Sequence, residues 1–454
     1  MTPFFRTYMV PVPRKELASP AKLTFPKFVL AGFLLHALPA GAQTPATPPA
    51  NYDETLVGSH LLPDPLHMQN GEPVGSTDAW MHKRRPEILR LFQEHVYGRT
   101  PSSWGKIRIE TLSETQSTLG GKARRKTLRI SLEEHPEWRG IEVLLYTPAS
   151  ATGPVPCFVG LNFRGNHAVT HEADVPISEG WLRFAKVVPP RPGEPTLPEQ
   201  TRGREHSRWI PETLISSGYA LATAFYGDIE PDHPTGWQEG VRAALSPAGK
   251  TTEWKAGDWG AIGAWAWGLS RILDALEKEP SVDASRCAVV GHSRLGKTAL
   301  WAGASDTRFS IVLSNNSGEG GAALMRRNFG ETVATITLRF PHWFAGRFGS
   351  YANNEAQCPV DQHLLVALAA PRPVAIGSAQ EDRWADPKGE FLSGKHAGTV
   401  YALFGKQGIA QDEPPAVGKS VGDTVQYHLR AGAHDITKDD WAEYLKFCSR
   451  HWGR

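Results

Sequence analysis

VVGHSRLGKTALWAGA, residues 289–304, is an apolar run that breaks at Gly291-His292-Ser293-Arg294 and then continues as an alanine-rich segment. A serine between small residues at a sharp strand-to-helix turn is typical of a nucleophile elbow, although the second glycine comes one place later than in G-x-S-x-G. Such a turn holds the Ser293 hydroxyl at the positive end of a helix dipole. The backbone N–H of Arg294 would then face a developing oxyanion. The alternative is that Ser293 only caps the helix.

Short apolar runs separated by helical or loop segments surround this stretch. Residues 86–98 and 259–280 have helical spacing, whereas 125–134 and 140–149 alternate and predict an antiparallel pair. Further strands are predicted at 155–163, 219–227, 286–293, 309–316, 373–380 and 424–432. Continuous apolar strands that alternate with helices predict a mostly parallel sheet covered by helices on both faces. The long connections 164–215 and 328–365 are expected to form the site.

The chain has 454 residues, 40% of them hydrophobic, and a formal net charge of only +2. We find no basic run that would favour nucleic-acid binding, and no internal repeat or linker within 50–454. Lys22 and Lys27 precede an apolar run at 28–38, which Ala40-Gly41-Ala42 follows as a cleavage site. We therefore expect a signal peptide over 1–42, a disordered leader over 43–52 and a single domain over 53–454, in a protein exported to the periplasm or the medium.

The four cysteines predict neither a metal site nor a bridge. Cys157 and Cys287 fall in predicted buried strands, and no pair has metal-ligand spacing. We expect no metal, no cofactor and no membrane span after signal cleavage, since about 11 apolar residues are too few to cross a bilayer.

His434 is the expected general base. In a fold with this elbow the partners follow the serine in the order acid, then histidine. His434 lies just past the last predicted strand and before an amphipathic helix, whereas His428 lies inside that strand.

Four segments together resemble the glucuronoyl esterases of carbohydrate esterase family 15, in their bacterial branch. They are GLNFRGNH (160–167), GHSRLGKTALWAGA (291–304), NSGEGGAAL (316–324) and EDRWADPKGEF (381–391). The resemblance runs from about residue 50 to the C-terminus. It implies an α/β-hydrolase three-layer sandwich without a metal, acting on esters that link the (4-O-methyl)glucuronic acid of glucuronoxylan to lignin alcohols.

One position departs from the pattern that the resemblance implies. The family's usual acid is a Glu at the head of the segment matching NSGEGGAAL, where this chain has Asn316. An amide cannot stabilise an imidazolium as a carboxylate does. We expect Asp382, after the next strand, to act as the acid, with Glu319 as the alternative and Glu381 and Asp386 as further candidates.

The resemblance also implies binding residues. Lys297 lies one helical turn after Ser293 on the same face, and Lys297, Glu331 and Trp384 match positions that contact the sugar. Arg294 would add its guanidinium to the oxyanion site. The structural alternatives are a solvated Glu331 and a packed Trp384.

The sequence thus predicts a monomeric serine esterase that forms an acyl-enzyme on Ser293. An acetyl xylan esterase would use the same three groups with a different pocket. A catalytically impaired sugar-binding homologue is the alternative that Asn316 suggests.

Overall fold

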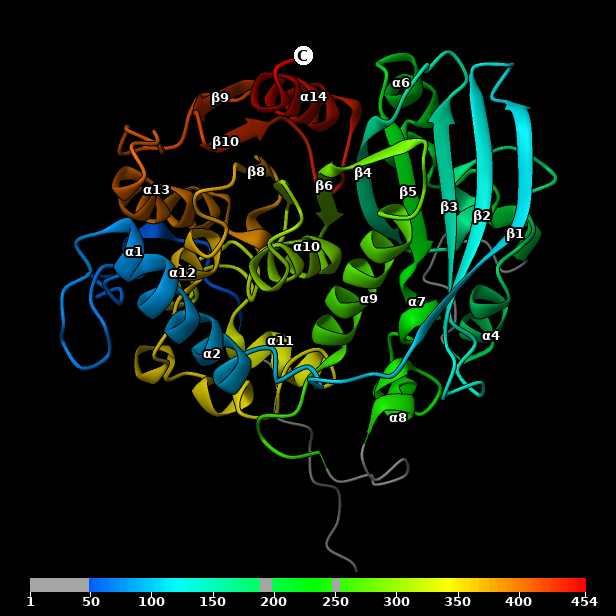
Figure 1. Ribbon diagram of the computed structural model, residues 1–454. Helices are drawn as coiled ribbons and strands as arrows, with labels where there is room; N and C mark the ends of the chain where they lie inside the picture. The colour runs from blue at the N-terminus through cyan, green and yellow to red at the C-terminus, as the bar shows by residue number, and fades with distance from the viewer. Residues whose placement is uncertain (1–48, 188–197, 247–253) are drawn as a thin grey trace, which may run out of the picture. The chain divides into compact units, whose positions relative to one another are not determined.

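The computed structural model describes residues 49–187, 198–246 and 254–454, whose strands form one sheet in the order β1-β2-β3-β5-β4-β6-β7-β8-β10-β9 (Figure 1). The central strands, β5, β4, β6, β7, β8 and β10, are parallel to one another. The outer strands β1, β2, β3 and β9 pair antiparallel with their neighbours. The strands are β1 (Ile107–Thr118), β2 (Ala123–Leu132), β3 (Ile141–Pro148), β4 (Val155–Asn162), β5 (Ala220–Phe225), β6 (Val282–His292), β7 (Ile311–Asn315), β8 (Val374–Ala379), β9 (Lys419–Gly422) and β10 (Val425–Arg430).

Helices cover both faces of this sheet and confirm the predicted three-layer arrangement. The apolar core on one face includes residues of α2 (Arg85–His95), α9 (Ala261–Leu276), α10 (Arg294–Ser305), α12 (Gln362–Ala367) and α13 (Pro387–Leu403). The other face packs against α6 (Pro211–Ser216) and α14 (Lys438–Trp452). The remaining α-helices are short: α1 (Thr77–Ala79), α3 (Asn166–Val169), α4 (Glu179–Val187), α5 (His206–Trp209), α7 (Tyr226–Ile229), α8 (Val241–Leu245) and α11 (Val333–Arg339).

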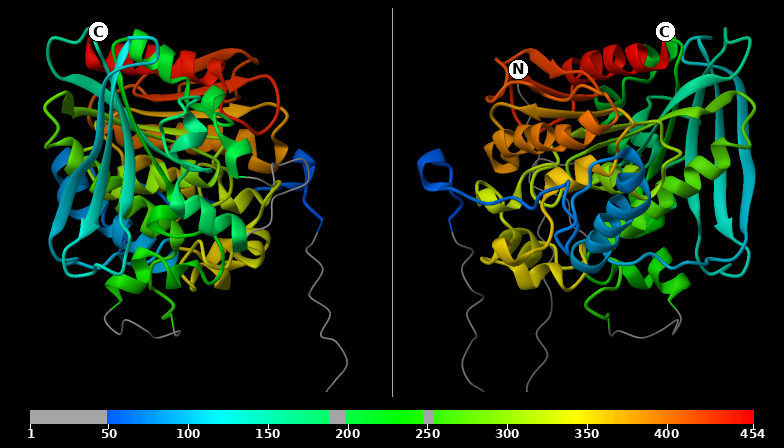
Figure 2. Two further views of the ribbon diagram at one scale, coloured as in Figure 1. Left: turned by 90° about the vertical axis from the view of Figure 1, so that its right-hand side faces the viewer. Right: turned by 60° about the vertical axis from the view of Figure 1, so that its left-hand side comes forward.

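The central strands have the composition that two-sided burial demands. Every residue of β4, β5, β7 and β8 is buried, as expected for parallel strands between two helical layers. Figure 2 shows the long, twisted β1–β3 ribbon at one edge, where burial alternates along β2.

The strand register brings the carboxyl ends of the parallel strands to one edge. His292 at the end of β6 pairs with Asn315 of β7, and Asn315 pairs with Gly377 of β8. Ala379 of β8 in turn pairs with Arg430 of β10. The loops that follow these four strands therefore emerge beside one another, which is where open α/β sheets bind their ligands.

Two strands were missed by the sequence reasoning. β1 and β9 lie at the two edges of the sheet and are mostly polar and exposed, so they carry no apolar pattern. The predicted signal peptide and residues 43–48 of the predicted leader lie outside the described residues. At the leader's other end, Asn51 accepts a backbone hydrogen bond from Gly330 at 2.8 Å, so the chain packs against the domain earlier than predicted.

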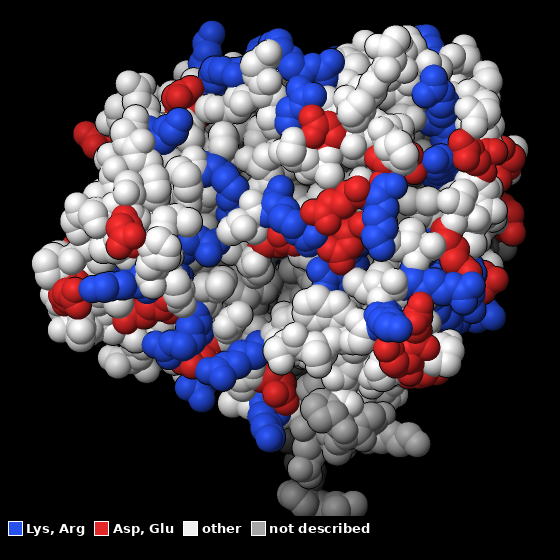
Figure 3. All heavy atoms as spheres, in the orientation of Figure 1, with Lys and Arg blue, Asp and Glu red and all other residues white. Residues whose placement is uncertain are grey.

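The surface in Figure 3 carries positive and negative side chains interspersed, in keeping with the small net charge. Among the described residues, none of the helices has the length and apolar character that a bilayer crossing requires.

Gly291 makes the close approach of β6 to α10 possible. A Cβ at this position would lie 1.9 Å from the Leu295 carbonyl oxygen and 2.8 Å from the Gly296 nitrogen, both backbone atoms. We expect Gly291→Ala to lower the free energy of unfolding by about 3 kcal/mol, since overpacking against backbone forces the chain to shift. Denaturant unfolding tests this, with Gly153→Ala as the control because its Cβ meets nothing within 4 Å. Equal stability of the two variants would contradict the expectation.

Candidate active site

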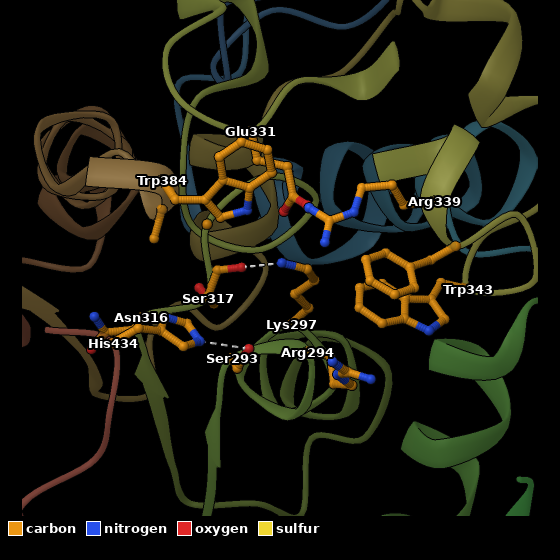
Figure 4. A pocket seen from close by; sticks show the side chains of 13 residues that line it. Ser293, Arg294, Lys297, Asn316, Ser317, Glu331, Arg339, Trp343, Trp384 and His434 are labelled. Atoms are coloured by element: carbon orange, nitrogen blue, oxygen red, sulfur yellow. Dashed lines mark hydrogen bonds between the residues drawn. The ribbon is translucent and has the colours of Figure 1, made fainter. Parts of the chain in front are cut away.

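Ser293 stands on a strained turn between β6 and α10. Its φ of 59° and ψ of −129° lie outside the ordinary regions for an L-residue, a conformation that costs about 1–3 kcal/mol and is concentrated at functional sites. Its N–H donates to the Asn315 carbonyl at 2.9 Å. The side chain makes no capping hydrogen bond to α10. Instead, Ser293 Oγ lies 2.9 Å from His434 Nε2 (Figure 4).

His434 lies in the loop between β10 and α14, which Arg430 holds in place. The Arg430 guanidinium donates to the carbonyl oxygens of Ala431, at 2.8 Å, and Ala433, at 3.0 Å, and to that of Asp435. Its Nε donates to the buried Asp440 at 2.6 Å. The loop is thereby fixed on both sides of His434.

Asp382 completes a hydrogen-bonded chain with Ser293 and His434. His434 Nδ1 lies 2.5 Å from Asp382 Oδ2. An ionised carboxylate only accepts, so Nδ1 carries the proton and Nε2 is left to accept from the Ser293 hydroxyl. This is the geometry of an acid–histidine–serine triad.

Asn316, at the position of the family's usual acid, supports the Asp382 carboxylate through a hydrogen bond. Asn316 Nδ2 donates to the same Asp382 Oδ2 at 2.7 Å. Burial raises the pKa of Asp382, but the hydrogen bond and charge of His434 and the hydrogen bond from Asn316 outweigh it, so the pKa lies below the usual value. The position that lacks the expected Glu thus donates to the carboxylate beside it.

The other candidate acids are engaged elsewhere. Glu319 is buried and accepts from the Gly320 N–H at 3.1 Å. Burial, together with the charges of Asp361 and Glu331, raises its pKa well above the usual value. Asp386 caps α13 and pairs with Arg327 at 2.7 Å, and Glu381 is exposed.

Glu390 is a structural residue of the site that sequence reasoning missed. Its Oε1 accepts from the backbone N–H groups of Ser317, at 2.7 Å, and Gly318, at 2.9 Å, and its Oε2 accepts from the Ser378 hydroxyl at 2.5 Å. Burial raises its pKa to about 7, against these hydrogen bonds. Glu390 holds the turn that carries Asn316, and its place within α13 offers no sequence signal for that task.

A pocket of about 160 Å³ opens beside Ser293 (Figure 4). It brings together Ser293 and His434 with all three predicted sugar contacts, Lys297, Glu331 and Trp384. Glu331 N–H donates to the Trp384 carbonyl at 2.9 Å, so these two residues from distant segments form one wall.

Two charged side chains of the pocket, Lys297 and Glu331, are buried. Lys297 and Glu331 are 4% and 8% exposed, and Lys297 Nζ donates to the Ser317 carbonyl. Burial lowers the pKa of Lys297, against the charges of Glu331, Glu319 and Glu390, which favour the ammonium form. Burial raises the pKa of Glu331, against the charges of Lys297 and Arg339. The structural alternative of a solvated Glu331 does not hold.

An aromatic wall, which sequence reasoning did not single out, faces these groups. The Arg294 guanidinium lies 4.6 Å from the Trp343 ring centre, and Trp343 stacks on Phe340 at 3.8 Å and 3°. Both rings line the pocket, as does Arg339. They come from the 328–365 connection, whose aromatic run FPHWF was the available signal.

The described residues contain no group of three His, Cys, Asp or Glu side chains able to hold a metal ion. Cys157, Cys287, Cys358 and Cys448 are all buried and free. The chemistry that this arrangement can perform is nucleophilic attack by an activated serine.

Asn316→Asp would set two carboxylates against each other at the Asp382 contact. Their repulsion raises the pKa of the pair above about 3.9, the value in an unfolded chain. We expect the variant to match wild-type stability most closely near pH 4 and to lose stability as pH rises through the raised pKa. Wild type behaves in the opposite sense, because the depressed pKa of Asp382 stabilises the fold above about pH 3.9. Unfolding free energies of both proteins between about pH 4 and pH 8 test this, and a constant difference over that range would contradict it.

The chain is similar in sequence and in fold to known carbohydrate esterases. The family model "Glucuronyl esterase, fungi" matches residues 254–405. Carbohydrate esterase MZ0003, from an unknown prokaryotic organism, is 45% identical over 403 residues, 88% of this chain and 92% of its own. A 4-O-methyl-glucuronoyl methylesterase of Schizophyllum commune is 26% identical over 85% of this chain and 82% of its own.

Among solved structures, a glucuronoyl esterase from Solibacter usitatus superposes with a TM-score of 0.82. It is 45% identical, and the match covers 88% of this chain and all of that one. The predicted family and the α/β-hydrolase fold are thereby confirmed. The chain belongs to the glucuronoyl esterases of carbohydrate esterase family 15 and is an esterase.

Proposed function

We propose that the protein hydrolyses glucuronoyl and 4-O-methylglucuronoyl esters that link glucuronoxylan to lignin alcohols, through an acyl-enzyme on Ser293. The observation that carries the proposal is the hydrogen-bonded chain Ser293–His434–Asp382, which opens on a pocket with a buried lysine and a buried glutamate. Membership of the family and the names of the relatives support the substrate class.

The reaction has two halves. Ser293 Oγ attacks the uronoyl carbonyl carbon while its proton passes to His434 Nε2. Collapse of the tetrahedral intermediate expels the alcohol, which takes that proton. His434 then removes a proton from water, which attacks the acyl carbonyl carbon. Collapse of the second tetrahedral intermediate breaks the bond to Ser293 Oγ, which takes the proton back from His434, and the released uronic acid gives up its proton to solvent as the uronate. Asp382 holds the imidazole in the correct tautomer and stabilises its positive charge throughout.

Arg294 stabilises the oxyanion in both halves. Its backbone N–H belongs to the first turn of α10, whose amides have no acceptor within the helix. Its guanidinium lies on the pocket wall. A preorganised donor aimed at the developing charge is often the largest single catalytic contribution.

The sugar is recognised by Lys297, Glu331 and Trp384. The ammonium donates to hydroxyls, the carboxylate accepts from them, and the indole offers an N–H and a flat face. Because all three are held by backbone contacts or burial, they are preorganised for a polar ring.

Export, a single catalytic domain and a monomeric state remain part of the proposal. The basic and apolar N-terminal segment with its A-x-A site supports export. A rival function is deacetylation of xylan, which the same triad would serve. An impaired sugar-binding homologue is less well supported, since Asp382 fills the acid's place beside His434.

The triad assignment predicts two contrasting effects of neutralising a carboxylate. Asp382→Asn removes the carboxylate charge that stabilises the imidazolium and fixes its tautomer, and should lower kcat on benzyl glucuronate by about 10⁴-fold. Glu319→Gln is the matched control and should keep kcat near the wild-type value, since Glu319 makes no described contact with His434. Steady-state kinetics test both, and the reverse pattern would overturn the choice of acid.

The substrate class is tested with the same protein on a panel of esters. Wild type should cleave benzyl glucuronate faster than methyl galacturonate or acetylated xylan, and Ser293→Ala should abolish this activity. Cleavage of acetyl groups alone would refute the uronate proposal. Inactivity on every ester would favour the sugar-binding homologue.

Lys297→Met separates sugar recognition from chemistry. A hydrogen bond from a charged group contributes about 1.5–3 kcal/mol, so kcat/KM on benzyl glucuronate should fall about tenfold or more. On 4-nitrophenyl acetate, which has no sugar, kcat/KM should stay near wild type. An equal loss on both esters would show that the lysine supports the fold rather than the sugar, through its bond to the Ser317 carbonyl.

A further inference from the structure

Asp232 is a buried carboxylate that the mechanism above does not use. It lies in the loop after α7, which follows the carboxyl end of β5, and its side chain is 2% exposed. A buried charge is costly unless several donors compensate it. The contacts of Asp232 therefore indicate what the residue is for.

Four donors converge on this carboxylate. Oδ2 accepts from the Tyr226 hydroxyl at 3.1 Å and from Arg294 Nη1. Oδ1 accepts from His342 Nε2 at 2.8 Å and from Trp343 Nε1 at 2.6 Å. Two oxygens accept about four hydrogen bonds, so the carboxylate is saturated. Burial raises its pKa, but the Arg294 charge and the His342 and Trp343 contacts outweigh this and hold the pKa below the usual value.

These donors come from three separate parts of the fold. Tyr226 follows β5, Arg294 opens α10 directly after the nucleophile, and His342 and Trp343 belong to the connection that forms the aromatic wall. The last two are themselves fixed, because their carbonyls accept from Ala261 and Ile262 at the start of α9, at 2.8 and 3.1 Å. Asp232 thus ties the first residue of α10 to a rigid wall.

The Arg294 guanidinium has two close neighbours. It is held between the Asp232 carboxylate and the face of Trp343, while the charge of Glu331 also attracts it. Without the Asp232 carboxylate, only the Trp343 ring and the Glu331 charge would remain to orient the guanidinium. Arg294 Nε is buried and has no partner among the described residues, so the orientation of the group depends on Nη1 and the ring.

We propose that Asp232 is a positioning residue, which fixes the Arg294 guanidinium at the oxyanion side of the pocket and away from Glu331. The inference rests on the proposed role of Arg294 in ester cleavage. The proposal goes beyond the triad, because it gives a residue in the loop after α7, which follows β5, a role in positioning the oxyanion donor.

A double-mutant cycle tests whether Asp232 acts through Arg294. Asp232→Asn keeps the shape but offers donors where acceptors are needed, and should lower kcat on benzyl glucuronate by about 10²-fold, the typical effect of losing one oxyanion donor. Arg294→Gln should lower kcat to a similar extent. The double variant should lose little more than either single variant, since residues that act as a unit are not additive. Wild-type kcat in Asp232→Asn, or multiplied losses in the double variant, would overturn the proposal.

Glu230→Gln is the matched control. Glu230 is also buried, lies two residues earlier and binds an arginine, with both carboxylate oxygens 2.8 Å from Arg242 Nε. It does not line the pocket. We expect lower thermal stability with unchanged kcat and KM. A drop in kcat equal to that of Asp232→Asn would mean that any buried ion pair in this loop has the same effect, and would refute positioning.

Two further measurements keep the test independent of folding and of the substrate. Should Asp232→Asn fail to fold, His342→Leu takes its place, because it removes one donor to Oδ1 without touching Arg294. It should lower kcat only when Arg294 is present.

The rate of Ser293 modification by a fluorophosphonate reports the oxyanion site whatever the natural ester. If that rate falls in Asp232→Asn while wild type cleaves no glucuronate, the substrate proposal fails and the positioning proposal stands. An unchanged rate would overturn the latter.

Discussion

The close approach of β6 to α10 at Gly291 is the constraint on which the site depends. Only a residue without a Cβ lets the strand end pass within contact of the Leu295 carbonyl, and the strained conformation of Ser293 follows from the sharpness of that turn. The turn raises the hydroxyl above the carboxyl edge of the sheet. The loops after β5, β7, β8 and β10 reach the same edge and carry Asp232, Asn316, Asp382 and His434.

Buried charges in this site are compensated locally, and this fixes their protonation. Asp382 keeps a low pKa because His434 and Asn316 both bind one oxygen, whereas Glu319, buried among other carboxylates, has a raised pKa. The low pKa of Asp382 favours the ionised form, which can stabilise an imidazolium. The raised pKa of Glu319 favours the protonated form, which cannot. An amide at position 316 is therefore compatible with the proposal that Asp382 is the acid, since Asn316 donates to the Asp382 carboxylate.

Local sequence patterns predicted the buried strands of a mostly parallel sheet and the turns that carry Ser293 and His434, because such strands and the loops after them have strong signatures. The family resemblance, together with the strand that precedes it, pointed to Asp382. The edge strands β1 and β9 were missed, since a solvated edge has no apolar pattern. Asp232 and Glu390 were missed for a different reason. Each is a single acidic residue whose donors come from distant segments, and no spacing along the chain reveals such convergence.

The central claim is that the uronoyl group passes through an ester on Ser293. Its most direct test is mass spectrometry of the protein quenched in acid during turnover of benzyl glucuronate, followed by proteolysis to locate the adduct. We predict an increase in mass equal to glucuronic acid less one molecule of water on the peptide that contains Ser293, and none in Ser293→Ala. A glucuronoyl adduct on another residue, or undiminished turnover by Ser293→Ala, would contradict the claim.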